Sequence, residues 1–512
     1  MTGKQSRLET GLSTASLLFM TLGCLMAPTA GLAGDGFADL GPHEALQAAH
    51  FEDSSRRAGP RLPPDGPMES SMPVGSEAGP SQVWQLRYNR GARSDRPEDL
   101  VVGPDKSVHL TGRSRIIGTS LSQMITIKIR PNGTARWRKR LSIPGGFVQG
   151  QALAVDSAGS TYVAAAAAAS GGFFRYVVVK YAPAGRREWK KDLSAEQLGG
   201  LGNAIAEDIV VDAFDNIYVT GRLASAESGS GYDGLTLKFD PLGNELWRER
   251  YSGGFSGSQQ PRMMAVSPDG NVVIAGTGPG SDGHSDFETL KYSPEGLLLW
   301  AKRTSGAPSQ TDVPEALVVA DDGNIHVAGR RGRNSSKSPF ATFLALDTLS
   351  SAGGTKWKRK HQGREHEAGA FSVDVDADGS VFVAGTTLDG PLESGSPFFD
   401  FVTAKYSSTG RLRWKRKWSS SPSFFTDFVA EVRATDDGGA IIVGQGYVSP
   451  QNYEYVLIRY SAAGDIVWTH KAGTGRRDLA RAMELDEDGG IYVTGTSDNG
   501  NNDDILTVKL QQ

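Results

Sequence analysis

The sequence contains a single cysteine, Cys24, in 512 residues. One thiol cannot form a disulfide within the chain, and it cannot supply the thiolates of a cysteine-based metal site. The chain also has no large excess of positive or negative charge, because 54 Lys and Arg oppose 58 Asp and Glu and leave a formal charge of −4. A balance this even excludes the strong positive field typical of nucleic-acid-binding proteins, so we expect no nucleic-acid partner.

Short catalytic and metal-binding motifs are absent as well. The sequence has no Gly-x-Ser-x-Gly elbow, no phosphate-cradling glycine loop and no His-Glu-x-x-His pair. "DVDADGS" (Asp374–Ser380) opens like a calcium loop, but Gly385 stands at the twelfth position, where an EF-hand needs a bidentate glutamate. We interpret this segment as a turn, and we expect no metal site and no cofactor.

Long apolar runs are missing outside the N-terminus. There, Lys4 and Arg7 precede the apolar stretch Leu12–Ala27, and small residues lead up to Ala33. This pattern predicts a signal peptide over residues 1–33, cleaved after Ala33. "TLGC" also resembles a bacterial lipobox, in which Cys24 would be lipidated. Simple secretion, lipidation and an uncleaved anchor remain open, and each predicts an extracytoplasmic protein, secreted or in the cell envelope, including an outer-membrane lipoprotein.

Residues 34–80 are rich in proline, glycine and serine, as in "GPRLPPDGPMESSMPVGSEAGPSQ". Such a composition cannot bury enough apolar surface to form a core. We predict a disordered linker over residues 34–80, between the export signal and a folded body over residues 81–512.

The folded body is a repeat. Each unit holds four strand-like runs, seen in the third unit as "EDIVVD", "NIYVTG", "GLTLKF" and "ELWRERY". The second run recurs eight times, from "SVHLTG" to "GIYVTG", and follows an acidic, glycine-bearing turn such as "SPDGN" or "DEDGG". Asp and Gly supply the side-chain cap and the positive φ that tight hairpins require.

Eight of the nine tryptophans follow the same period, at spacings of 52 to 58 residues, and only Trp418 lies outside the series. The series is Trp84, Trp137, Trp189, Trp247, Trp300, Trp357, Trp414 and Trp468. Four strands and one large aromatic in about 50 residues are typical of a β-propeller blade. We expect each indole to fill the gap between the outer edges of neighbouring blades.

The two ends of the repeat complete each other. The first tryptophan lies in "SQVWQLRY", before any complete unit, and the last unit stops after its third run, "DDILTVKL". An open ring would leave unpaired strand edges. The sequence therefore predicts an all-β fold, an eight-bladed β-propeller of four-stranded blades, closed by pairing the N-terminal strand with the C-terminal three.

The sequence of acidic turn, "YVTG", "xTxKY" and a final tryptophan resembles the SBBP-type repeat of bacterial β-propellers. This resemblance covers about residues 81–510 and implies an exported or cell-surface scaffold without a common catalytic set. The fifth unit departs most, since "FLALDTLSSAGGTKW" has Leu346 where the others have tyrosine and a turn that reads as longer.

Two sets of residues are candidates for binding. Basic residues follow the tryptophans and predict a positive rim, although charged edge strands also prevent sheet-to-sheet association. The strongest are Arg138, Lys139, Arg140, Lys358, Arg359, Lys360, Lys415, Arg416 and Lys417. A second column enters the first strands and would ring the mouth of a central channel, where polar residues are also what water requires. It comprises Glu98, Gln151, Glu207, Arg262, Glu315 and Arg481.

These observations favour an exported, non-enzymatic propeller that binds an unknown protein or an anionic envelope polymer, as a monomer, at the bacterial cell envelope. Loops between second and third runs, such as "LDGPLESGSPFFDF", vary most and would gather on one face. Two alternatives remain open: a lipoprotein scaffold of an envelope assembly complex, and a quinone-dependent dehydrogenase. The second rests on "FDPLGNELW", which resembles the tryptophan-docking repeat of quinoproteins, but the adjacent-cysteine pair common in those enzymes is missing.

Overall fold

The computed structural model describes residues 78–512 except 92, 226–230, 254–256, 333–341, 362–367, 389–398, 421–425 and 450–451. All described residues belong to the compact unit Ser71–Gln512. The predicted signal peptide, Cys24, nearly all of the predicted linker and most of the loop "LDGPLESGSPFFDF" lie outside the described residues.

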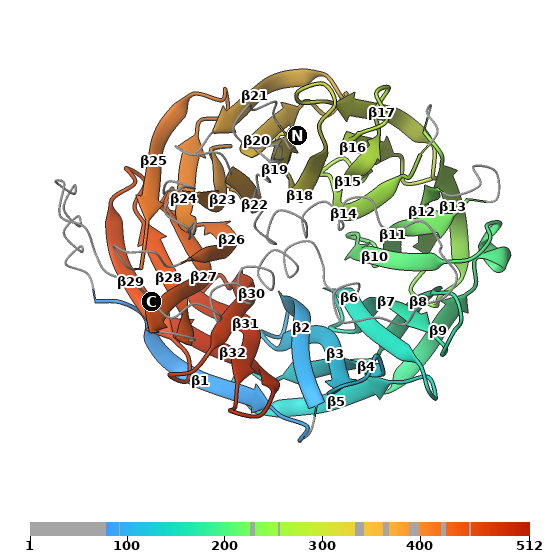
Figure 1. Cartoon of the computed structure of the whole chain (residues 1–512), viewed down its shortest axis with the longest axis horizontal. Helices are drawn as coiled ribbons and strands as arrows, with labels where there is room; N and C mark the ends of the chain where they lie inside the picture. Colours follow the sequence, from blue (N-terminus) through green and yellow to red (C-terminus); the bar gives the residue numbers. More distant parts are fainter. Residues whose placement is uncertain are drawn as a thin grey trace, which may run out of the picture. The chain divides into compact units, whose positions relative to one another are not determined.

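Eight four-stranded antiparallel sheets surround one axis, as the sequence predicts (Figure 1). We number the blades in chain order from the first complete one. Their strands, from the axis outward, are: blade 1, β2 Arg93–Val102, β3 Val108–Ile116, β4 Ser122–Ile129 and β5 Ala135–Leu141; blade 2, β6 Phe147–Val155, β7 Thr161–Ala168, β8 Arg175–Tyr181 and β9 Arg187–Leu193; blade 3, β10 Ala204–Val211, β11 Ile217–Ala224, β12 Tyr232–Phe239 and β13 Glu245–Tyr251; blade 4, β14 Gln260–Val266, β15 Val272–Pro279, β16 Ser285–Tyr292 and β17 Leu298–Thr304; blade 5, β18 Asp312–Val319, β19 Ile325–Gly332, β20 Thr342–Leu349 and β21 Thr355–His361; blade 6, β22 Ala368–Val375, β23 Val381–Leu388, β24 Phe399–Tyr406 and β25 Leu412–Trp418; blade 7, β26 Phe428–Ala434, β27 Ala440–Ser449, β28 Asn452–Tyr460 and β29 Ile466–Ala472; blade 8, β30 Asp478–Leu485, β31 Gly490–Asp498, β32 Asp503–Gln511 and β1 Ser81–Tyr88.

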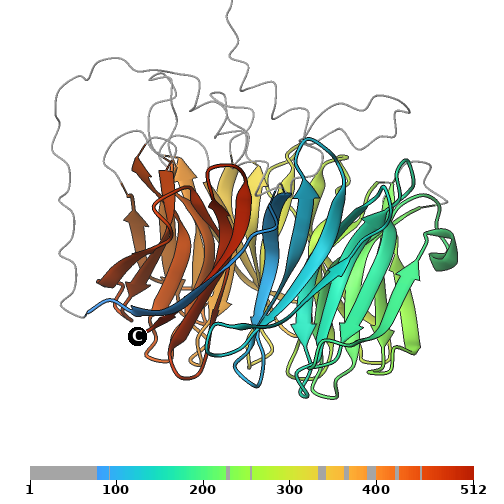
Figure 2. The same cartoon turned by 90° about the horizontal axis from the view of Figure 1, so that it is seen from below.

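Blade 8 closes the ring, and the predicted pairing of the two chain ends is confirmed. The N-terminal strand β1 pairs antiparallel with the C-terminal strand β32, from Ser81 opposite Gln511 to Tyr88 opposite Ile505. Figure 2 shows this N-terminal strand, in blue, crossing the outside of the red C-terminal strands. One short helical turn, η1 (Glu196–Leu198), interrupts the strands, and the described residues hold no helix long and apolar enough to span a membrane.

The second and third strands of the blades form the core. In β7 all eight residues are buried, and in β24 all eight again. A strand hidden on both faces by neighbouring blades needs apolar residues at consecutive positions, which explains runs such as "IYVTG".

Seven of the eight series tryptophans, Trp84 through Trp414, tie their blade to the next one by an indole hydrogen bond, as expected of a residue that fills the gap between outer edges. The indole Nε1 of Trp414 in blade 6 donates to the carbonyl oxygen of Ala462 in blade 7 at 3.0 Å. Trp84 in blade 8 donates to the carbonyl oxygen of Pro131 in blade 1 at 2.9 Å. The receiving turns carry a positive-φ glycine against the indole, such as Gly464 against Trp414, because a Cβ there would stand 2.6 Å from the ring.

The fifth blade corrects one detail of the sequence analysis. Thr348, not Leu346, lies opposite Trp357, so Thr348 holds the usual lysine position and Leu349 holds that of the tyrosine. The turn that follows, closed by the Ser350 N–H on the Gly354 carbonyl, matches the turn from Ser293 to Leu297 in blade 4. The turn is therefore not longer, and the serine and glycine residues that continue the segment suggested a false register.

Candidate functional site around the axis and on the outer edge

The innermost strand of every blade contains a β-bulge, and all six predicted channel residues are bulge residues. The register shifts by one residue at Glu98 in β2, and the same shift occurs in the other seven innermost strands. We call the eight bulge residues the axial ring: Glu98, Gln151, Glu207, Arg262, Glu315, Phe371, Ala430 and Arg481. Phe371 and Ala430 escaped the sequence prediction because they are not polar.

The bulge also explains the glycine of the "YVTG" run. Opposite each bulge, the backbone carbonyl two residues earlier approaches the second strand closely. A Cβ at Gly385 would lie 1.9 Å from the carbonyl oxygen of Gly369, and one at Gly112 would lie 2.1 Å from that of Arg96. Seven of the eight blades have glycine at this position, which the close backbone explains without any ligand, and blade 2 has Ala165 there.

Charged members of the axial ring pair with one another across blades. Arg481 Nη2 of blade 8 lies 2.8 Å from Glu98 Oε2 of blade 1, whose side chain is 5% exposed. Arg262 of blade 4 lies 3.7 Å from Glu315 of blade 5. Burial lowers the pKa of the Arg262 guanidinium, and the Glu315 and Glu207 carboxylates oppose this change.

Other members pair with residues that the sequence analysis missed. Arg222 Nε lies 2.9 Å from Glu207 Oε1, and Arg330 Nε lies 3.4 Å from Glu315 Oε1. Gln151 accepts a hydrogen bond of 3.3 Å from Gln149, which lies two positions earlier in β6. A recurring Gly-Arg after the second run, in "LTGR", "VTGR" and "VAGR", was the available signal for the arginines.

A second set of axial polar side chains joins neighbouring blades through the backbone: Asp99, Asp208, Ser372 and Glu431. The residue after the bulge is polar in blades 1, 3, 6 and 7, and there its side chain accepts the N–H of the next blade's innermost strand. Asp99 accepts from Leu153 at 2.8 Å, and Asp208 accepts from Met264 at 2.7 Å. Burial raises the pKa of both carboxyl groups to about 7. These residues hold the ring together.

The aspartates of "DVDADGS" serve the backbone and a lysine, in keeping with a turn. Asp374 accepts the Ala434 N–H at 2.7 Å, while Asp376 accepts the N–H groups of Asp378 and Ser380 and lies 3.3 Å from Lys405 Nζ. Among the described residues, no three His, Cys, Asp or Glu side chains lie close enough together to hold a metal ion.

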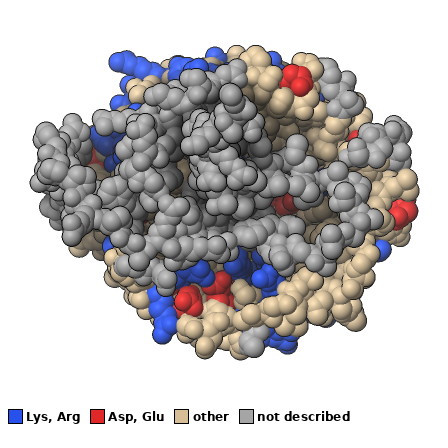
Figure 3. Space-filling view, viewed as in Figure 1, with Lys and Arg blue, Asp and Glu red and all other residues tan. Residues whose placement is uncertain are grey.

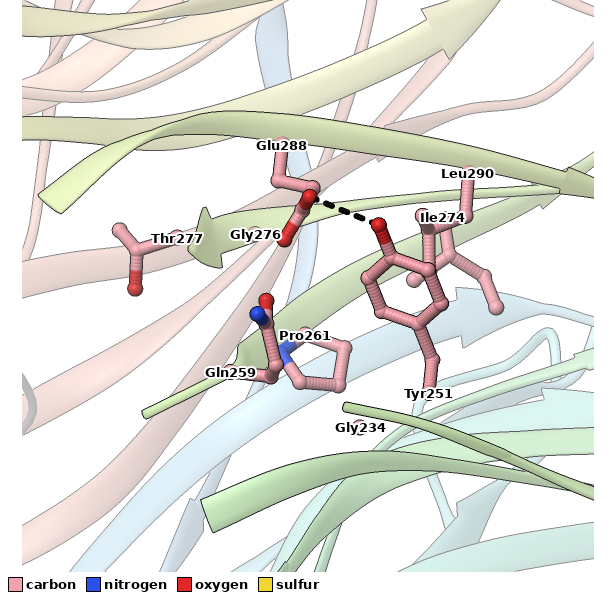
Figure 4. Close-up of a pocket in the computed structure, with 9 residues that line it drawn as sticks. All are labelled: Gly234, Tyr251, Gln259, Pro261, Ile274, Gly276, Thr277, Glu288 and Leu290. Atoms are coloured by element: carbon pink, nitrogen blue, oxygen red, sulfur yellow. Dashed lines mark hydrogen bonds between the residues drawn. The ribbon is translucent and has the colours of Figure 1, made fainter. Parts of the chain in front are cut away.

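A small recess lies between blades 3 and 4 (Figure 4). Its volume is about 220 Å³, and its lining includes Tyr251, Gln259 and Glu288. Glu288 Oε1 accepts hydrogen bonds from the Tyr251 hydroxyl at 3.0 Å and from Arg303 at 2.9 Å. Glu288 Oε2 is buried and has no hydrogen-bond partner among the described residues. Sites for drug-sized ligands start at about 300 Å³, so the recess fits water or a similarly small polar group.

The predicted basic rim lies on the outermost strands. Arg138, Lys139 and Arg140 belong to β5, and none of them forms an ion pair with another described residue. Lys358 lies 3.6 Å from Asp347, and Lys417 lies 2.6 Å from Asp400. Figure 3 shows Lys and Arg gathered at the upper left edge, where Figure 1 places β21 and β25.

The two central arginines of the rim are structural. Arg359 donates to the Gly410 carbonyl of the next blade at 2.6 Å and stacks over Trp357, and Arg416 donates to the Gly464 carbonyl at 2.7 Å and stacks over Trp414. Their neighbours Lys358, Lys360, Lys415 and Lys417 are left on the surface of β21 and β25.

Comparisons with known proteins support the fold and no particular activity. No family model matches the chain. An uncharacterised WD repeat-containing protein of Acanthamoeba polyphaga mimivirus is 23% identical, over 30% of this chain and 14% of that protein. The chain thus matches about a seventh of that relative's length.

Among solved structures, Sqt1 of Chaetomium thermophilum is similar with a TM-score of 0.50 and 10% identity, covering 85% of this chain and 98% of that one. The polysaccharide lyase Uly1 has a TM-score of 0.45 and 13% identity, covering 71% and 90% of the two chains. A Dyadobacter fermentans protein of unknown function has a TM-score of 0.40 and 11% identity, covering 85% and 99%. The last two similarities carry no argument about function. The chain is a β-propeller protein of WD-repeat-like architecture.

Proposed function

We propose that this protein is an exported, non-enzymatic β-propeller of the SBBP-repeat type that serves as a binding scaffold at the bacterial cell envelope. Its partner in this proposal is an anionic envelope polymer, bound at the outer edge of the ring. The export signal of residues 1–33 and the repeat pattern support the location, and the closed ring supports the role of a rigid scaffold.

The observation that carries the proposal is the contrast between two sets of charges. Axial-ring charges pair with each other, as Arg481 does with Glu98 and Arg262 with Glu315, so they are engaged in holding the ring. The lysines of the outermost strands β21 and β25 instead face solvent, as Lys360 and Lys415 do. Exposed cations on a rigid body attract an anionic polymer at little cost in ordering.

The test is the binding of the full-length protein to immobilised acidic polysaccharide, with neutral dextran as the control. We expect retention on the acidic polymer alone, and we expect it to weaken steadily as salt rises, because salt screens exposed charges. Equal retention on dextran, or retention that is insensitive to salt, would argue against this function. Absence of binding to any acidic polymer would leave the protein partner as the remaining hypothesis.

A further inference from the structure

We propose that blades 5 and 6 together form the binding surface, and that its ligand is a linear acidic polysaccharide. This inference rests on the proposed function and adds its location and ligand class. The surface, here called the cationic face, consists of Lys356, Lys358, Lys360, Arg413, Lys415 and Lys417.

Strand geometry aligns these cations in two rows. In β21, Lys356, Lys358 and Lys360 alternate with Trp357 and Arg359, and all three lysines are exposed. Alternate residues of a strand point to the same side, about 6.7 Å apart. Strand β25 repeats the arrangement with Arg413, Lys415 and Lys417, which are likewise exposed.

The two rows adjoin. Lys415 Nζ of blade 6 lies 3.3 Å from His361 Nδ1, the last residue of β21 in blade 5. Arg359 of β21 also reaches the Gly410 carbonyl, in the turn that precedes β25. Six cations therefore share one continuous surface, long enough to contact several repeats of an extended polymer.

Acidic residues neutralise this surface only in part. Neither β21 nor β25 contains an aspartate or glutamate. Two buried aspartates lie next to the cationic face, Asp347 at 3.6 Å from Lys358 and Asp400 at 2.6 Å from Lys417. Asp347 also lies 2.7 Å from Arg331. In blade 3, by contrast, Arg248 pairs with Glu245 inside the same outermost strand, and Arg250 pairs with Asp233.

Protection of strand edges does not explain the uneven distribution of these charges. Every blade exposes an outermost strand, so edge protection predicts cations on all eight. Exposed leucines occur in β17 of blade 4 and β13 of blade 3, as in β25, but β17 has no exposed cation and β13 has only Arg248 and Arg250. The cations gather on blades 5 and 6, and the only comparable row is that of β5, Arg136, Arg138 and Arg140.

The chemistry of the face favours a polysaccharide over nucleic acid. Five of its six cations are lysines, which act as point charges and need no planar, bidentate partner. The whole chain carries a formal charge of −4, which opposes the approach of a densely charged duplex. A polymer with one separated acidic group per repeat suits two rows of spaced ammonium groups.

The experiment compares two neutralised variants of the full-length protein by titration calorimetry with polygalacturonate at low salt. K356Q/K360Q/K415Q removes three cations from the cationic face, and R136Q/R138Q/R140Q removes the same charge from blade 1. Lys358 and Lys417 stay unchanged because each lies next to a buried aspartate. Circular dichroism and melting curves establish that both variants are folded.

We expect the first variant to bind about tenfold more weakly and the second to change by less than about threefold, because three exposed ion pairs sum to roughly 1.4 kcal/mol. Equal weakening in both variants would overturn the location, since it would mean attraction by overall charge. Tighter binding of duplex DNA than of polygalacturonate by the wild type would overturn the ligand class. No binding of the wild type to any acidic polysaccharide would refute the proposed function itself.

Discussion

Arg87 and Asp504 form an ion pair of 2.8 Å between residues 417 positions apart in the sequence. Asp504 is fully buried, and Asn89 and Asn499 donate further hydrogen bonds to it at 3.0 and 2.9 Å. Strand β1 therefore contributes to β32 both backbone hydrogen bonds and the guanidinium of Arg87. This ion pair adds a side-chain contact to the backbone pairing that closes the ring.

Deleting Ser81–Tyr88 should open the ring. The deletion removes the outermost strand of blade 8, the Arg87 partner of Asp504 and the Trp84 contact with Pro131, and it exposes the edge of β32. We expect a marked drop in melting temperature and aggregation, because an unpaired edge recruits other chains. A chain that begins at Ser81 is the control. A deletion variant with the same melting temperature as the control chain would contradict closure of the ring by β1.

Replacing Trp414 separates packing from hydrogen bonding at a blade junction. Trp414 is 6% exposed and packs against Phe382 and Tyr460. Trp414→Ala should cost about 3–5 kcal/mol of unfolding free energy because it leaves a cavity. Trp414→Phe keeps an aromatic ring and loses the bond to Ala462, so it should cost roughly 1–2 kcal/mol. Urea denaturation measures both, and equal costs for the two variants would be inconsistent with this division.

Gly385→Ala tests the close approach at the bulge of blade 6. The new methyl group would meet the Gly369 carbonyl oxygen, and moving that backbone should cost about 1–3 kcal/mol. Blade 2 has Ala165 at this position, opposite Gly150, so an altered bulge can be built. Gly354→Ala is the control, because its nearest neighbour is the movable Ser350 hydroxyl at 3.3 Å. Equal stability of the two variants would remove the steric explanation of the glycine.

Asp99 and Asp208 should make stability depend on pH. Their pKa values are about 7 in the folded ring, whereas an unfolded aspartate titrates near about 4. A raised folded pKa means that the contribution is complete below about pH 4 and is lost as pH rises through about 7. Hydrogen bonds from Ser267 and Lys291 lower the pKa of Asp269, so its contribution to stability has the opposite sign. The pH dependence of wild-type stability must therefore be compared with that of a variant in which Asp99 and Asp208 cannot ionise.

The double variant D99N/D208N keeps an oxygen to accept the Leu153 and Met264 N–H groups but cannot ionise. Relative to wild type, it should gain up to about 5 kcal/mol in unfolding free energy between pH 5 and pH 8, because each of the two raised pKa values costs the wild type roughly 2.6 kcal/mol over this range. Denaturation at the two pH values gives this difference directly. An identical pH dependence for variant and wild type would show that neither carboxyl group titrates in this window.

The sequence predicted the architecture well because the repeat is expressed in the chain itself. Eight acidic turns and eight tryptophans set the number of blades, and the missing fourth run after Leu510 pointed to Trp84. The axial column could also be aligned, since a bulge occurs at one position of every innermost strand. The ion pairs within this column could not be predicted, because Arg262 approaches Glu315 only when blades 4 and 5 lie side by side.

The difference between the rim residues was likewise hidden from the sequence. "KRK" follows both Trp357 and Trp414, but alternation places the outer two lysines on the surface and the central arginine against the tryptophan. Which acidic residues lie nearby depends on the third strand, as Lys358 and Asp347 illustrate. The sequence already marked the segments of blades 1, 5 and 6 as the most basic, but it did not show which of their cations reach the surface.

Hydrogen–deuterium exchange of the full-length protein with and without polygalacturonate tests the central claim most directly. Outermost strands have backbone N–H groups on their free side that exchange readily, so a ligand lying along them slows their exchange. We predict protection in β21 (Thr355–His361) and β25 (Leu412–Trp418), with no effect of neutral dextran. Protection confined to the innermost strands, around Glu98, Arg262 and Arg481, would contradict this account and move the binding site to the axis.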